Sequence, residues 1–64
     1  MISTPMDALN EMKGNPVVVR TKQNEEIKGK LLSFDLNQNM SLDTKDGIRF
    51  VQGQNVSDIS PYQD

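Results

Sequence analysis

The stretch with the most hydrogen-bonding chemistry is a polar loop that follows a predicted strand. It carries Asp35, Asn37, Gln38 and Asn39 within five positions. Amide side chains both donate and accept hydrogen bonds, and these are more numerous than a turn alone requires. Asn37 and Asn39 also suit a turn, because Asn tolerates left-handed backbone angles and forms Asx-turns. For Asp35 we favour the role of a loop organiser that accepts backbone N–H bonds.

A second polar segment, residues 52–55, follows another predicted strand. Gln52 and Asn55 either belong to the same site as the first loop or simply end their strands. Gly53 between them is expected to meet a backbone requirement, whichever alternative holds.

The residues needed for catalysis are missing from the chain. There is no His, no Cys and no Gly-rich phosphate loop. The carboxylates are scattered, and the adjacent pair Glu25 and Glu26 falls in a predicted turn. We therefore expect no enzyme activity, no cofactor and no metal site, and binding is the kind of function that the residues favour.

A long strand precedes the first polar loop, and its apolar pattern changes phase. Ile27, Gly29 and Leu31 share one face, after which Leu32, Phe34 and Leu36 continue the pattern from the opposite parity. A change of phase within a strand indicates a bulge or a sharp bend. Gly29 permits such curvature because it has no Cβ. A long curved strand is what closes a small sheet into a barrel.

The opposite face of this strand carries Lys28 and Lys30. We interpret them as a solvated strand face, with contact to phosphate groups as the alternative.

The remaining elements complete a mainly β fold: a short N-terminal helix followed by a five-stranded, strongly bent antiparallel sheet. Thr4 is the expected helix cap, Met6, Leu9 and Met12 form its apolar stripe, and Gly14 ends it. Lys45-Asp46-Gly47 predicts a tight hairpin, Pro61 is expected to end the last strand, and Tyr62 to lie in a frayed tail. Residues 1–64 are expected to be one domain, with a helix at about 4–13 and strands at about 16–22, 26–35, 39–44, 48–52 and 55–59.

Size and charge limit the function further. A chain of 64 residues buries only roughly 60 % of its unfolded surface. Without disulfides or a metal, self-association is the expected source of added stability. The net charge of −2 excludes a general electrostatic nucleic-acid binder but not a local pocket that reads bases. No membrane span or signal peptide is visible, so we expect a soluble, cytoplasmic protein.

Taken together, the order and spacing of these residues resemble the Sm/LSm family, especially its archaeal Sm-like members. The first Sm motif is matched by Val17, Val19, Gly29, Leu31, Phe34, Asp35, Asn39 and Leu42. The second is matched by residues 51–56, with Ile59-Ser60-Pro61 after it. The resemblance covers almost the whole chain.

This resemblance implies a homo-oligomeric ring, joined through edge strands at about 48–52 and 55–59, that binds short U-rich single-stranded RNA at its inner rim in RNA processing or turnover. The implied RNA-binding residues are Asn37, Asn39, Gln52 and Gly53, with Asp35 organising the loop. Asn37 stands where binding members have a base-stacking ring, and Gln52 stands where they have Arg. These departures keep a second hypothesis open: a ring with a degenerate pocket that serves as a structural or protein-interaction scaffold.

Overall fold

The structure is a computed structural model that describes residues 5–62, with side chains from Asp7 onward. Thr4 and the side chain of Met6, which were expected to cap the helix and to join its apolar stripe, lie outside the described part. The elements in chain order are α1 (Pro5–Met12), β1 (Pro16–Thr21), β2 (Glu26–Phe34), β3 (Met40–Thr44), β4 (Gly47–Val51), a single 3-10 turn at Gly53–Asn55, and β5 (Val56–Pro61). Their bounds differ from the expected ranges by at most two residues.

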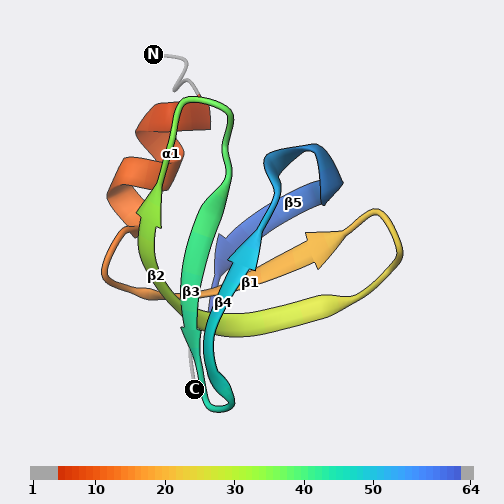
Figure 1. Cartoon of the computed structure of the whole chain (residues 1–64). Helices are drawn as coiled ribbons and strands as arrows, with labels where there is room; N and C mark the ends of the chain where they lie inside the picture. The colour runs from red at the N-terminus through yellow and green to blue at the C-terminus, as the bar shows by residue number, and fades with distance from the viewer. Residues whose placement is uncertain (1–4, 63–64) are drawn as a thin grey trace.

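The five strands form one antiparallel sheet in the order β4-β3-β2-β1-β5. The sheet curls so strongly that β4 and β5 come to the same side of the molecule in Figure 1, although they are its two edges. The expected fold class, a short helix followed by a strongly bent five-stranded antiparallel sheet, is confirmed.

The bend is concentrated in β2. The pairing of β2 with β3 shifts register between Leu31 and Ser33, which is the expected bulge. Gly29 lies so close to β3 that an added Cβ would stand 2.8 Å from the carbonyl oxygen of Asp43. Past the bulge, Phe34 packs against the core. Leu36 does not continue this pattern: it is 86 % exposed, because the strand ends at Phe34 and Leu36 lies in the loop.

One hydrophobic core fills the interior of the curled sheet. Leu31, Leu42, Val17 and Val19 are completely buried within it. Leu9 of α1 is 3 % exposed, and Met12 packs beside it, so the helix closes the core. Gly14 follows the helix with φ +84°, the left-handed conformation expected after a helix. Its N–H donates to the carbonyl of Leu31 at 2.7 Å and joins the end of the helix to β2.

The hairpin and the C-terminal segment differ in how well they follow the expectations. The β3–β4 turn is tight, with Gly47 at φ +116°, and Thr44 Oγ1 donates to the Gly47 carbonyl at 2.7 Å. The expectation of a frayed tail is wrong for Tyr62. β5 continues through Pro61, and the Tyr62 N–H then donates to the Pro16 carbonyl at 3.0 Å, which extends the pairing with β1.

Candidate nucleic-acid interface

The two polar segments singled out in the sequence meet at one end of the sheet. The β2–β3 loop and the turn between β4 and β5 both lie at the upper end in Figure 1, away from the β3–β4 hairpin. They are joined by a hydrogen bond of 2.8 Å from the Gly53 N–H to Asn39 Oδ1. This bond brings residues 14 positions apart into one site.

Gly53 is required by this contact. A Cβ at this position would collide with the carbonyl oxygen of Asn37 and would lie 2.9 Å from that of Gln38. Its φ is not positive, so the requirement is one of space. Any larger residue would push the two loops apart.

Asp35 accepts three hydrogen bonds from the first loop. Its Oδ1 accepts the backbone N–H groups of Asn37 at 2.8 Å and of Asn39 at 3.0 Å. Its Oδ2 accepts Asn39 Nδ2–H at 3.1 Å. The Asn39 amide, followed by the two backbone N–H groups, lowers the pKa of the Asp35 carboxyl because all three donate to its charged form. Gln38 adopts φ +64° within the turn that this carboxylate holds together.

Asn39 connects the two loops. Its amide oxygen accepts from Gly53 and its amide nitrogen donates to Asp35. An amide has two N–H donors and two lone pairs, so one donor and one acceptor position stay available for a ligand. Asn37, in contrast, is exposed, and within residues 5–62 its side chain makes no hydrogen bond while its backbone N–H donates to Asp35 Oδ1. It has no ring that could stack on a base.

A cavity of about 260 Å³ lies beside these loops. Polar groups at its border come from Asp35, Asn39 and Gln52, and apolar walls from Phe34, Met40, Phe50 and Val51. None of the residues that line it is Lys or Arg. The cavity therefore offers hydrogen bonds and apolar contact, but no positive charge for a phosphate group.

Some members of this site were not foreseen in the sequence. Ser33 and Ser41 share a hydrogen bond of 2.6 Å on the cavity wall, and Gln54 Nε2 donates to Gln52 Oε1 at 3.1 Å. Phe50 borders the cavity although it is 82 % exposed. The alternation along the strands does not identify the Ser33–Ser41 pair, because the bulge in β2 changes which side chains meet across β2 and β3.

Two other classes of site were searched for in the described residues. Residues 5–62 contain no group of three or more His, Cys, Asp or Glu side chains arranged to hold a metal ion. In the same range, no helix has the length and apolar character of a membrane span.

A short helix that closes a curled five-stranded sheet, with two polar loops joined by an Asn–Gly hydrogen bond, is typical of the Sm class of small β-barrel. Residues 7–60 match the LSM domain. A putative snRNP Sm-like protein of Methanosarcina barkeri is 32 % identical over 72 residues, which covers 95 % of this chain and 100 % of that protein.

Solved structures give the same result. The Sm protein of Pyrococcus abyssii in complex with a uridine heptamer has a TM-score of 0.85 at 27 % identity and covers 94 % of this chain and 100 % of that one. The SmAP1 heptamer of P. aerophilum has a TM-score of 0.83 at 30 % identity and covers 100 % of both chains. The chain belongs to the Sm/LSm family, whose members are non-enzymatic RNA-binding proteins.

Proposed function

We propose that this protein binds short, U-rich single-stranded RNA in the cavity between its two polar loops and acts in RNA processing or turnover in the cytoplasm. The observation that carries the proposal is that Asp35, Asn39 and Gln52 border one cavity, with Gly53 hydrogen-bonded to Asn39. The free N–H of Asn39 suits the carbonyl edge of uracil, and the apolar walls suit a base face. The uridine complex of the Pyrococcus abyssii protein supports this choice of ligand.

The proposal includes a homo-oligomeric ring in which each chain, residues 1–64, is one domain. β4 of one copy would pair with β5 of the next, because both are edge strands and unpaired edges favour association. Ile48 and Phe50 on β4 are 63 % and 82 % exposed, and a strand paired with this edge would cover them. A ring would repeat the cavity in every copy, so weak sites would add up through avidity.

Fluorescence anisotropy with labelled oligo-U, oligo-C and oligo-A tests the base reading. We expect oligo-U to bind more tightly than oligo-C, by about 2- to 12-fold for each hydrogen bond lost. The same affinity for all three would contradict the proposal.

A substitution that adds function avoids the uncertainty of a damaged loop. Asn37→His supplies a ring at an exposed position whose side chain makes no hydrogen bond within the described residues. Base stacking is worth about 1–3 kcal/mol, so oligo-U affinity should rise at least about 5-fold. Asn10→His on the exposed face of α1 is the matched control. No gain at position 37 would contradict a base bound against the β2–β3 loop.

The second candidate function is a structural or protein-interaction scaffold. The lack of a stacking ring at Asn37 and of any Lys or Arg around the cavity favours it. Absence of binding to all three oligonucleotides, together with an intact oligomer, is the result that this alternative predicts.

A further inference from the structure

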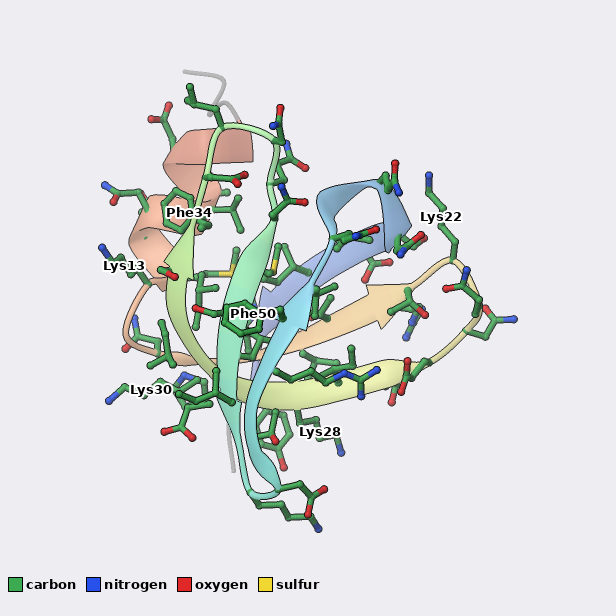
Figure 2. The ribbon with its side chains drawn as sticks, in the orientation of Figure 1. Lys13, Lys22, Lys28, Lys30, Phe34 and Phe50 are labelled. Atoms are coloured by element: carbon green, nitrogen blue, oxygen red, sulfur yellow. The ribbon has the colours of Figure 1, made fainter. Side chains whose placement is uncertain are left out.

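A groove at the other end of the molecule is left without a role by the proposed function. It has a volume of about 1050 Å³ and is formed by β2, by the β3–β4 hairpin and by Pro16 and Tyr62. Figure 2 shows Lys28 and Lys30 beside the lower part of β2, at the end of the sheet opposite the polar loops. They are exposed and lie two residues apart on one face of the strand, which separates them by roughly 6.6 Å along its axis.

The groove concentrates positive charge in an acidic protein. Four of the chain's seven Lys and Arg residues line it, namely Lys28, Lys30, Lys45 and Arg49, against two acids, Glu26 and Asp46. Glu26 is paired with Arg20 at 3.1 Å, and Arg49 with Glu25 at 2.9 Å. The three lysines take part in neither of these two ion pairs.

An aromatic ring lies among these charges. Lys28 Nζ is 5.2 Å from the centroid of the Tyr62 ring, within the range of a cation–π contact. The backbone of Tyr62 is held by the hydrogen bond from its N–H to the Pro16 carbonyl. An aromatic ring next to ammonium groups is a combination with which proteins hold single-stranded nucleic acid, since the ring stacks on bases and the cations follow the phosphates.

The two ends of the molecule therefore have complementary chemistry. The cavity between the polar loops has amides for base edges but no cation. The groove has cations and a ring but few groups that distinguish one base from another. An RNA strand needs both, because phosphate contacts supply much of the affinity and base contacts supply the specificity.

We propose that this groove is a second contact surface for single-stranded RNA, in which Lys28, Lys30 and Lys45 bind phosphate groups and Tyr62 stacks on a base without selecting its identity. The proposal shares its class of ligand with the proposed function but uses different residues. The two proposals can be tested separately. Substitutions in the groove should weaken the affinities for oligo-U and oligo-A by the same factor, whereas substitutions in the polar loops should change the ratio of these two affinities.

The test measures the dependence of affinity on salt for full-length protein with oligo-U and oligo-A. For single strands the slope of log K against log salt is about −0.7 per phosphate neutralised. Lys28→Gln/Lys30→Gln should make it shallower by about 1.4 for both oligonucleotides. Lys13→Gln, at the end of the helix and outside the groove, is the matched control and should leave it unchanged.

Tyr62 is tested separately. Tyr62→Leu should weaken both oligonucleotides at least about 5-fold, while Tyr62→Phe, which keeps the ring, should not. Light scattering and circular dichroism on each variant check that assembly and folding are intact. A salt slope that is the same in the lysine double variant and in Lys13→Gln would overturn the proposal.

Binding of labelled poly-glutamate identifies a different partner. If labelled poly-glutamate binds the wild type but not the lysine double variant, while the salt slope for RNA is the same in both proteins, the groove is a docking surface for acidic protein and the proposal is wrong. Failure of the proposed function gives a different result. The wild type would then bind oligo-U and oligo-A with the same affinity, while the lysine double variant would still have a shallower salt slope than the wild type.

Discussion

At the scale of single residues, Asn39 and Asp35 hold the polar loops together and also border the proposed RNA-binding cavity. Asn39 was expected to read a base, and the structure uses half of its hydrogen-bonding capacity to join the two loops. Base reading by Asn39 stays a prediction, and it concerns the one donor and one acceptor that these bonds leave. A loss of RNA binding in Asn39→Ala would therefore mix two effects, which is why Asn37→His is the cleaner experiment.

Asp35 should make stability depend on pH. Its pKa in the folded state is below the ordinary value of 3.8, so its contribution is fully present above that value and is lost as pH falls through the folded-state pKa. Asp35→Asn should lower the urea midpoint at neutral pH, and the gap to the wild type should close in acid. Asp43→Asn, on the exposed face of β3, is the control. A gap that is constant with pH would contradict the role assigned to the Asp35 charge.

At the scale of elements, the curvature of β2 positions everything else. The register shift after Leu31 and the close approach at Gly29 turn the strand. The polar loop that follows is thereby carried to the turn between β4 and β5.

Gly29→Ala should destabilise the fold through this bend. The added Cβ would meet the Asp43 carbonyl oxygen at 2.8 Å and Thr44 Cγ2 at 3.2 Å, and two backbones cannot move apart without loss of pairing. Such overpacking costs about 1–3 kcal/mol, which lowers the thermal midpoint by at least about 4 °C in a domain of this size. The midpoint is measured by circular dichroism at a fixed chain concentration. Lys30→Ala on the outer face of β2 should change it little, and an unchanged midpoint for Gly29→Ala would show that the strand relaxes freely.

At the scale of the whole molecule, self-association is the proposed answer to the small size of the core. Among the described side chains, eight buried apolar residues form that core, while Ile48 and Phe50 on β4 are left exposed. A neighbouring β5 would cover them.

Light scattering after gel filtration measures the proposed assembly. The wild type should have a mass several times that of the 7.2 kDa chain, and Phe50→Asp should reduce it, because a charge would be buried at the strand-to-strand contact. Leu36→Asp is matched in exposure, at 86 % against 82 %, but lies in a loop, so its mass should stay at the wild-type value. A wild-type mass of a single chain would refute the ring.

The sequence alone was sufficient for the class of fold, because periodicity, turn residues and the bulge after Leu31 are local signals. Gly29 and Gly53 could be recognised as backbone requirements for the same reason. The sequence did not reveal that Leu36 is exposed, because the end of β2 depends on the turn in which Asp35 binds the backbone of Asn37 and Asn39.

Only the tertiary structure decided which distant groups meet. The Gly53–Asn39 bond and the pairing of Tyr62 with Pro16 join segments that are 14 or more positions apart. Lys28 and Lys30 were interpreted as a solvated face because a strand pattern shows only which side they occupy. Their place in a groove with Tyr62 and the β3–β4 hairpin follows from the curl of the sheet. The curl depends on the backbone angles of many residues, so it cannot be predicted from the spacing of a few.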